Sequence, residues 1–221
     1  VLENEFHLLM KEGNIVEQVF FSNKNIKSLI CGNNQLTSLD VSQNTALHSL
    51  QCQNNDLSSL DVSYNTALIY LDCAGNQLTN LDVTNNIAVF NLQCHYNNLT
   101  SLDVSNNTAL TLLYCHYNQL TSLDVRNGNN DSLNFICATN PNLTCISVDN
   151  AAWSTAHWTF ANGNIDLQHY FSNNCSGTAI KENTTKKELL RTIDVLGRKT
   201  KKEPLFYIYD DGTIEKKIII E

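Results

Sequence analysis

Cysteine recurs every 21 residues through the first half of this chain of 221 residues. Each copy lies in a string close to LxxLxCxxNxLTSLDVSxNTA, and the copies stand at Cys31, Cys52, Cys73, Cys94 and Cys115. A fixed period of this length marks a chain built of stacked rungs, in which each rung buries its apolar face against its neighbours. The sequence therefore predicts a solenoid in which residues one period apart lie side by side.

The alternation of side chains within each repeat predicts strands. The repeats cover residues 29–44, 50–65, 71–86, 92–107 and 113–126, and a degenerate rung follows at 135–148. In Leu50-Gln51-Cys52 apolar and polar residues alternate, which is typical of a short strand with one buried face. A second alternation, Leu60-Asp61-Val62, predicts an extended return path, because 21 residues leave little room for a long helix. We expect a mainly β solenoid with a parallel sheet.

The repeated string resembles the consensus of the leucine-rich-repeat family, LxxLxLxxNxL, with cysteine in the third apolar position. The resemblance covers residues 19–150, and five near-perfect copies carry it. It implies a leucine-rich-repeat solenoid with 21-residue rungs at 29–149. An N-terminal cap or half rung is expected at 1–28 and a C-terminal cap at 150–178, because a stacked sheet needs its two ends covered.

Three columns of repeated polar residues are interpreted as structural. Asparagines at the end of each strand and of each return path can satisfy backbone groups of their own rung and the next, because an amide both donates and accepts. The cysteine column, continued by Cys137, is predicted to consist of buried free thiols, since zinc needs four converging ligands with close spacing. The aspartates from Asp40 to Asp124 are predicted to cap the following turn; calcium binding is the alternative. No metal or other cofactor is expected.

The residues after the last repeat are predicted to close the solenoid. Asn150 precedes a possible short helix, and Trp153 and Trp158 are expected to cover the last rung. Cys145 and Cys175 flank this segment, and a disulfide between them is plausible in an oxidising compartment.

An enzymatic interpretation of the same segment is the weaker alternative. His157, Asp166, His169 and Cys175 lie close in the sequence, as in a cysteine–histidine nucleophile. No local motif supports this arrangement, and a disulfide at Cys175 would remove the nucleophile.

The distribution of charge excludes some partners. Residues 1–180 include four basic and fourteen acidic side chains, whereas residues 181–221 include ten basic and eight acidic ones. Nucleic acids and anionic membranes require clustered cations, so neither is expected to bind the acidic part. We expect no direct transmembrane insertion, because no apolar run approaches the length of a span. The chain opens at Val1 without a leader, so we expect that an export signal was removed or that the chain is a fragment.

The last forty or so residues have a different pattern of strand, turn and strand. Asp211-Gly212 between two apolar runs predicts a hairpin. The runs IDVLGR, PLFYIYDDGT and EKK before a terminal apolar strand resemble the C-terminal sorting domain of cargo of the Bacteroidetes type IX secretion system. This resemblance rests above all on Asp194, Gly197, Arg198, Lys216 and Lys217.

The second resemblance implies a small β-domain at 179–221 and export across the outer membrane. It places the protein outside the cell or on the outer-membrane surface of a Gram-negative bacterium. The segment is shorter than the usual sorting domain and lacks its early strands, so export is implied more strongly than anchoring. An ordinary small β-domain is the alternative.

A binding surface is expected where the repeat breaks down on the outward strand positions. Aromatic and imidazole side chains, which are enriched in binding surfaces, concentrate there on the third to fifth rungs. The predicted contact patch consists of Tyr70, His95, Tyr96, Tyr114, His116 and Tyr117. The alternative is recent duplication, because the string HYN occurs in two adjacent rungs.

Three functional hypotheses follow. The leading one is a secreted or cell-surface, non-enzymatic binding or adhesion module that recognises a protein, peptide or glycan through the sheet face. The second is an accessory subunit held by an outer-membrane transport or secretion complex, such as the type IX machinery, through the C-terminal domain. The third is ice or mineral binding through a regular hydroxyl column: Thr37, Ser58, Thr79, Thr100 and Thr121.

Overall fold

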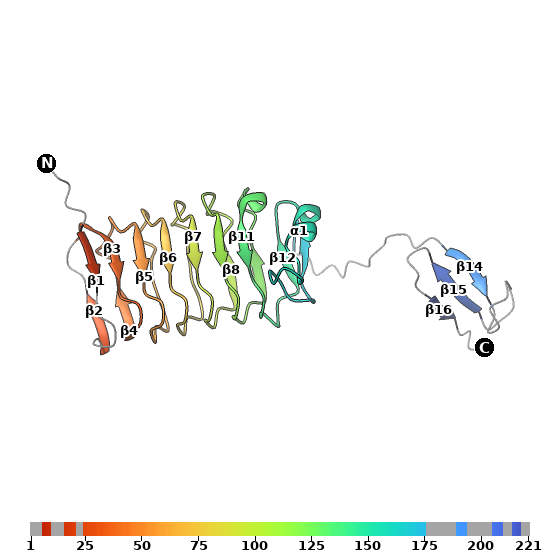
Figure 1. Ribbon diagram of the computed structural model, residues 1–221, viewed down its shortest axis with the longest axis horizontal. Helices are drawn as coiled ribbons and strands as arrows, with labels where there is room; N and C mark the ends of the chain where they lie inside the picture. The colour runs from red at the N-terminus through yellow and green to blue at the C-terminus, as the bar shows by residue number, and fades with distance from the viewer. Residues whose placement is uncertain are drawn as a thin grey trace. The chain divides into compact units, whose positions relative to one another are not determined.

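The alternating segment of each repeat forms a short strand, and these strands pair in register. In the computed structural model, a sheet of seven parallel strands has the order β1-β3-β5-β6-β7-β9-β11. Its strands are β1 (Phe6–Leu9), β3 (Ile26–Ile30), β5 (Ser49–Gln51), β6 (Tyr70–Asp72), β7 (Asn91–Gln93), β9 (Leu112–Tyr114) and β11 (Asn134–Ile136). Residues one period apart are direct neighbours, as predicted (Figure 1). We number the rungs 1 to 6 by the strands from β3 to β11.

The structure describes residues 24–175 throughout and, outside that range, the strands β1, β2, β14, β15 and β16. The chain divides into two units, residues 1–175 and residues 176–221. The first unit is the solenoid. No helix of the described residues is long and apolar enough to cross a membrane.

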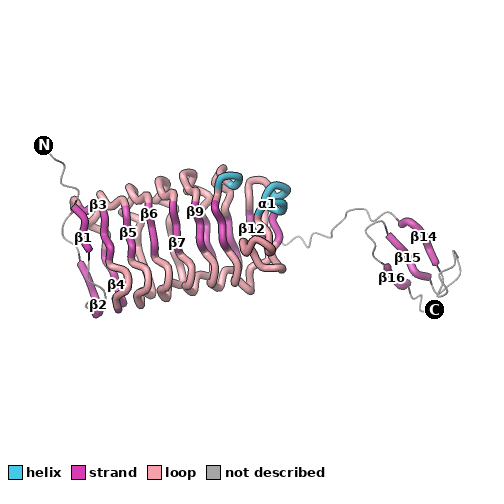
Figure 2. Tube along the Cα trace, viewed as in Figure 1, coloured by secondary structure: helices cyan, strands magenta, loops and turns pink. Residues whose placement is uncertain are grey.

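The return path is extended, as the second alternation predicted. Strand β2 (Val16–Phe20) pairs with β4 (Gln35–Asp40), and a four-stranded parallel sheet has the order β13-β12-β10-β8. Its strands are β8 (Ser101–Asp103), β10 (Ser122–Asp124), β12 (Cys145–Ser147) and β13 (Tyr170–Ser172). The return paths of rungs 2 and 3 contain no assigned strand. Helical segments, η1 (Asn130–Ser132) and α1 (Ala151–His157), lie only toward the C-terminal end of the solenoid (Figure 2).

The N-terminal end, for which a cap or half rung is predicted, contains two strands. Strand β1 extends the first sheet beyond β3, and β2 lies beside β4 on the return side. Both sides of the solenoid therefore continue past rung 1. The repeat consensus is absent from these residues, which is why the sequence predicted only a partial rung there.

The core consists of leucine, valine and cysteine columns that point inward. The six cysteines of the ladder, including Cys137, are free, buried thiols with no exposed surface, as predicted. Burial raises the pKa of the Cys31 thiol to about 12 and raises the pKa of the next four thiols well above the ordinary value. These side chains act as small apolar groups, because the charged thiolate is disfavoured in the core.

The asparagine ladders hold neighbouring rungs together. The Asn55 amide donates to the carbonyls of Cys31 and Cys52, at 3.0 and 3.1 Å, and accepts from the backbone N–H of Leu36. The same bonds recur one period later at Asn76, Asn97 and Asn118. On the return side, the amide of Asn65 donates to carbonyls of the preceding rung, and Asn86 and Asn107 repeat this bond. The strand-end amides satisfy buried backbone groups of two rungs and the return-side amides satisfy those of the preceding rung, which confirms the structural interpretation.

The aspartate column caps turns, as predicted. Each carboxylate accepts a hydrogen bond from the backbone N–H two residues later, for example from Ser42 to Asp40 and from Ser63 to Asp61, both at 2.9 Å. Hydrogen bonds from the side chains and backbone N–H groups of Ser63 and Thr84 lower the pKa of Asp61 and Asp82, and those from the backbone N–H and side chain of Ser42 lower the pKa of Asp40. The carboxylates are therefore used by their own turns.

The C-terminal cap covers the last rung. Asn150 caps α1 by accepting from the backbone N–H of Trp153 at 3.0 Å. Trp158 is buried and its ring packs on Phe135 of rung 6, with 4.5 Å between centroids. Trp153 is partly buried against the same core. The two tryptophans therefore form the predicted cover.

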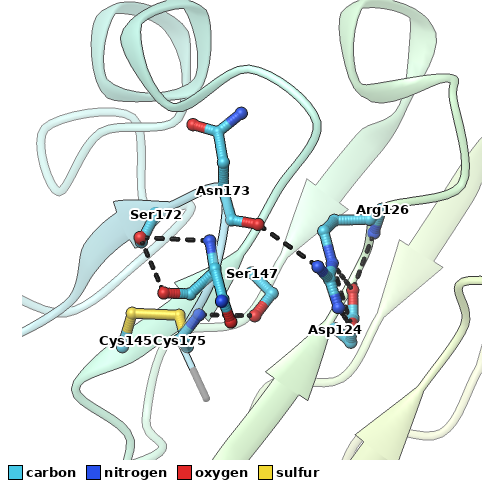
Figure 3. The surroundings of a disulfide bond; sticks show 8 residues. Asp124, Arg126, Cys145, Ser147, Ser172, Asn173 and Cys175 are labelled. Carbon is cyan, nitrogen blue, oxygen red and sulfur yellow. Dashed lines mark hydrogen bonds and ion pairs between the residues drawn. A yellow bond between two sulfur atoms is a disulfide. The ribbon is translucent and has the colours of Figure 1, made fainter. Parts of the chain in front are cut away.

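A disulfide joins Cys145 in β12 to Cys175 after β13 (Figure 3). Beside it, Arg126 pairs with Asp124 and donates to the carbonyl of Asn173 at 3.2 Å. Both links fasten the end of the cap to the last return strands.

The second unit contains an antiparallel sheet with the order β14-β15-β16. Its strands are β14 (Leu189–Ile193), β15 (Leu205–Tyr209) and β16 (Ile214–Lys217). The adjacent strands β15 and β16 form the predicted hairpin. Lys216 and Lys217 end β16, whereas Asp194, Gly197 and Arg198 of the sorting-type motif lie outside the described residues.

Candidate functional site

The outward face of the first sheet brings five of the six predicted contact residues into one cluster. Strand register sets His95 against His116, with ring centroids 4.5 Å apart, and Tyr96 against Tyr117 at 4.4 Å. Both pairs are stacked, with planes inclined by 11°. Tyr114 meets the two imidazoles edge-on. We call His95, Tyr96, Tyr114, His116 and Tyr117 the aromatic cluster.

Tyr70, the sixth predicted residue, is connected to the cluster only indirectly. Its hydroxyl accepts a hydrogen bond from the side chain of Gln93 at 2.9 Å. Gln93 lies on the strand that leads into His95 and Tyr96. Tyr70 therefore stands at the edge of the surface.

The two stacked tyrosines occupy an unusual backbone conformation. One residue in each rung has a positive φ directly after the strand, and these residues form the left-handed column: Asn33, Asn54, Gly75, Tyr96, Tyr117 and Thr139. Asparagine and glycine tolerate this conformation, whereas a bulky side chain loses about 1–2 kcal/mol in it. Rungs 1 to 3 follow that preference, and rungs 4 and 5 place tyrosine at φ 53° instead.

The cluster is exposed, aromatic and uncharged at neutral pH. Tyr96 and Tyr117 are 52% and 46% exposed, while the histidines lie half-buried behind them. Burial lowers the pKa of His95, and burial together with the neighbouring His95 lowers the pKa of His116 to about 4. Both imidazoles are therefore neutral near pH 7. The surface offers ring faces and edges rather than charge.

A single carboxylate lies beside this aromatic surface. Asp72 is the only charged residue in the three outward columns of the first sheet that contain Tyr70, Asp72 and Ala74, histidine counted as neutral. Its side chain accepts from the backbone N–H of Ala74 at 3.1 Å, which turns the carboxylate toward the left-handed column. Burial raises the pKa of Asp72. Sequence reasoning did not select this residue, although it replaces the glutamines at Gln51 and Gln93.

An open pocket of about 390 Å³ lies at the cap, next to the end of the left-handed column. Its lining is Thr139, Pro141, Phe160, Asp166, Leu167 and Gln168. Thr139 belongs to the column and accepts from the backbone N–H of Asn118. Sequence reasoning missed this pocket because four of its lining residues, Phe160, Asp166, Leu167 and Gln168, lie outside the repeats.

A small apolar group outside the predicted patch was also missed. Ile69, Ile87 and Phe90 are 39%, 60% and 44% exposed, and Phe90 donates its backbone N–H to the carbonyl of Ile69. The signal was available, because the same columns hold histidine and threonine in other rungs.

The structure contradicts the nucleophile hypothesis for the cap. Cys175 is in a disulfide, so it has no thiol to react. His157 stacks on Trp153, with 4.1 Å between ring centroids. Asp166 and His169 do meet, at 3.5 Å, but the carboxylate accepts the backbone N–H groups of Thr139 and Asn140. The pair holds the cap to rung 6.

The hydroxyl column considered for ice or mineral binding is exposed in every rung. Thr121 uses its hydroxyl to donate to the carbonyl of Thr100 at 3.1 Å. Mineral binding through this column stays a prediction.

Comparisons with known proteins concern the solenoid. No family model matches the chain, and no curated protein matches its sequence. Among solved structures, it is similar to the functional domain of InlJ from Listeria monocytogenes, which includes a cysteine ladder, with 33% identity and a TM-score of 0.49 over 64% of this chain and 38% of that one. A leucine-rich-repeat protein of Leptospira interrogans has 24% identity and a TM-score of 0.48 over 57% and 39%. YopM, a leucine-rich effector protein from Yersinia pestis, has 23% identity and a TM-score of 0.41 over 57% and 32%.

The chain thus spans about two fifths or less of the length of these structures. Its own strands and periods describe a mainly β, parallel-sheet solenoid with 21-residue rungs. The repeated consensus string and the parallel sheet that its strands form give this chain the leucine-rich-repeat solenoid fold.

Proposed function

We propose that this chain is a non-enzymatic protein-binding module and that the aromatic cluster on rungs 4 and 5 is its contact surface. The observation that carries the proposal is the pair of tyrosines in the left-handed column. The column accepts asparagine or glycine without strain, so tyrosine there costs about 1–2 kcal/mol of backbone free energy. Backbone strain of this kind is typical of positions retained for function.

The geometry of the cluster suits a protein partner. Stacking holds Tyr96 and Tyr117 in place before binding, so little side-chain entropy is lost when a partner docks. Exposed tyrosines supply large amphipathic contact areas, and they are frequent at the centres of protein interfaces. The neutral imidazoles behind them present no charge that a partner would have to desolvate.

Affinity capture with a matched control tests this proposal. The immobilised full chain is incubated with surface proteins of the organism that makes it, and the double variant Tyr96→Asn/Tyr117→Asn is run in parallel. Asparagine is the residue that rungs 1 and 2 use at this position, so the variant keeps the fold. We expect a protein that binds the wild type to lose about tenfold or more in affinity for the variant.

Tyr64→Asn is the control, because Tyr64 is 58% exposed outside the cluster and its column contains Asn85 and Asn106. It should bind like the wild type. Equal capture by the wild type and the double variant would contradict the proposed surface. The partner is a carbohydrate if two results coincide. No captured protein depends on the two tyrosines, and the double variant fails to bind a glycan that the wild type binds on a glycan array.

We propose further that the module is secreted and acts on or outside the outer-membrane surface, with residues 179–221 as a type IX sorting-type domain. The antiparallel strands β14, β15 and β16 and the disulfide in the cap support this proposal, since disulfides persist in oxidising compartments. Retention by an outer-membrane secretion complex through the same domain is the alternative.

Export is measured by producing the full chain in Bacteroidetes cells with and without an active type IX system. We expect the chain to reach the medium or become accessible to added protease only when the system is active. A chain that lacks residues 179–221 should stay in the cell and should not cross the outer membrane. Equal export in both hosts would remove the sorting assignment and leave the binding proposal in place.

A further inference from the structure

The left-handed column has one position without a side chain. Asparagine stands there in rungs 1 and 2, tyrosine in rungs 4 and 5, and threonine in rung 6, while rung 3 has Gly75. Rung 3 therefore contributes no side chain to the column directly beside the first tyrosine of the aromatic cluster, and only the side-chain oxygen of Asn54 from rung 2 reaches over Gly75.

The stacked pair shows how a planar group would fill that position. Tyr117 covers one face of Tyr96 from the next rung, at 4.4 Å between centroids and with nearly parallel planes. Neighbouring strands of a sheet are about 4.8 Å apart, so a planar group above Gly75 would stand at the same separation on the other side. Among the described residues, no ring packs against that side of Tyr96, which is 52% exposed.

The polar groups around the empty position are hydrogen-bond acceptors. The side-chain oxygen of Asn54 lies over Gly75, where a Cβ atom would contact it. On rung 3, the Asp72 carboxylate is turned toward this turn by its bond from Ala74. Among the described residues Asp72 forms no ion pair. A partly buried carboxylate without a cation is a costly arrangement that a bound cation would relieve.

We infer that the position above Gly75 receives an arginine side chain of the protein partner, with its guanidinium stacked on Tyr96 and hydrogen-bonded to Asp72. The inference rests on the proposed binding function and specifies the chemistry of the partner. A guanidinium is planar, stacks on aromatic faces and presents several donors in one plane. An aromatic side chain would stack equally well but would bury Asp72 unpaired, and a lysine would pair with Asp72 without stacking as a plane.

The columns of the solenoid provide matched variants for a test. Asp72→Gln introduces the residue found at positions 51 and 93, and Gly75→Asn introduces the residue found at positions 33 and 54. The new asparagine would displace the side-chain oxygen of Asn54 and lie in ordinary contact with the Cα atom of Asn54, and asparagine tolerates the positive φ of 62°. Both positions lie next to His95, whose imidazole interacts with the Asp72 carboxylate and whose carbonyl accepts from the backbone N–H of Gly75, but neither change replaces a residue of the aromatic cluster. Thermal unfolding verifies that both variants fold.

The probe is a phage-displayed library of random linear peptides, selected on the full chain. Selected peptides whose binding depends on Tyr96 and Tyr117 are synthesised, and their affinities are measured by fluorescence anisotropy. We expect these peptides to share an arginine. Replacing it by citrulline, which keeps the shape and removes the charge, should weaken binding to the wild type about tenfold.

A double-mutant cycle decides the assignment. On Asp72→Gln the difference in affinity between the arginine and citrulline peptides should become much smaller, because the carboxylate is gone and only the stacking on Tyr96 still distinguishes them. Gly75→Asn should weaken the arginine peptide about tenfold by occupying its place.

Peptides that need both tyrosines but bind Asp72→Gln and Gly75→Asn as well as the wild type would overturn the arginine site and leave the proposed function standing. If no selected peptide depends on Tyr96 or Tyr117, the peptide-binding surface and the arginine site fail together.

Discussion

Rungs 2 and 4 are alike inside and different outside. Asn55 and Asn97 donate to equivalent pairs of cysteine carbonyls and accept from equivalent leucine backbone N–H groups, and Cys52 and Cys94 are equally buried. The outward residues after each strand are Gln53-Asn54 in rung 2 and His95-Tyr96 in rung 4. An inward side chain must fit the rungs on both sides of it, whereas an outward one meets mainly solvent. The exterior is therefore where rungs acquire separate roles.

The largest expected effect tests the likeness of the two interiors. Asn55→Ala and Asn97→Ala each remove three buried hydrogen bonds and leave their backbone partners unsatisfied, so each should reduce the free energy of unfolding by about 3–5 kcal/mol. Urea denaturation measures both. Costs that differ between the two by more than about 1 kcal/mol would show that the rungs are not equivalent inside.

A smaller effect on stability comes from the outward imidazoles of His95 and His116 in rungs 4 and 5. Their pKa values are lowered by burial, for His116 to about 4, so the unfolded chain binds more protons than the folded one below the ordinary histidine pKa. Stability is therefore complete above about pH 6.5 and is lost as the pH falls toward 4. Allowing for partial exposure, we expect a loss of about 1–2 kcal/mol between about pH 7.5 and pH 4.5.

The matched control for this pH effect is His95→Gln/His116→Gln, which introduces the residue found at position 53. Urea denaturation of both proteins at the two pH values isolates the histidines from the aspartates, whose lowered pKa values also favour the folded state at neutral pH. An identical pH dependence in the two proteins would contradict the lowered pKa values of the imidazoles.

A tyrosine placed in the left-handed column of rung 2 should lower the free energy of unfolding by about 1–2 kcal/mol. Asn54→Tyr places a bulky residue at a φ of 54°, and its neighbours Asn33 and Gly75 provide no ring to stack on. Thermal unfolding, with Tyr64→Asn as a variant outside the column, measures this loss. A fully stable Asn54→Tyr would mean that the column accepts tyrosine freely, which would weaken the functional argument.

The reverse change should have almost no net effect on stability. Tyr96→Asn relieves about 1–2 kcal/mol of backbone strain but loses a stacked ring pair worth about 0.5–1.5 kcal/mol. We expect the midpoint of urea unfolding to stay close to that of the wild type, while partner binding falls. A large destabilisation would make Tyr96 a structural residue.

Much of the fold follows from the period. Once rungs stack in register, the burial of Cys73, the bonds of Asn76 and the pairing of Leu71 with Leu92 are determined by spacing alone. The strands β1 and β2 were harder to predict from the sequence. Their residues lack the consensus, and they join the sheets by pairing with rung 1.

The candidate site was predictable to the extent that it lies in columns. The register of HYN in two rungs was enough to bring Tyr96 beside Tyr117. The strain at these tyrosines also had a signal, since rungs 1 to 3 hold Asn33, Asn54 and Gly75 in the same column. The orientation of Asp72 toward that column needed coordinates, because it depends on a hydrogen bond to Ala74 that no spacing reveals.

Because the rungs stack in register, equivalent outward positions recur at a fixed spacing along this solenoid. The buried residues beneath each outward position are the same in the next rung. A pair such as His-Tyr can therefore occupy the equivalent position one rung further along, about 4.8 Å away, without a change in the core. Duplication or deletion of one 21-residue unit would alter the spacing between two contact groups by the same increment. The number of repeats between two contact groups therefore sets how far apart they bind on a partner.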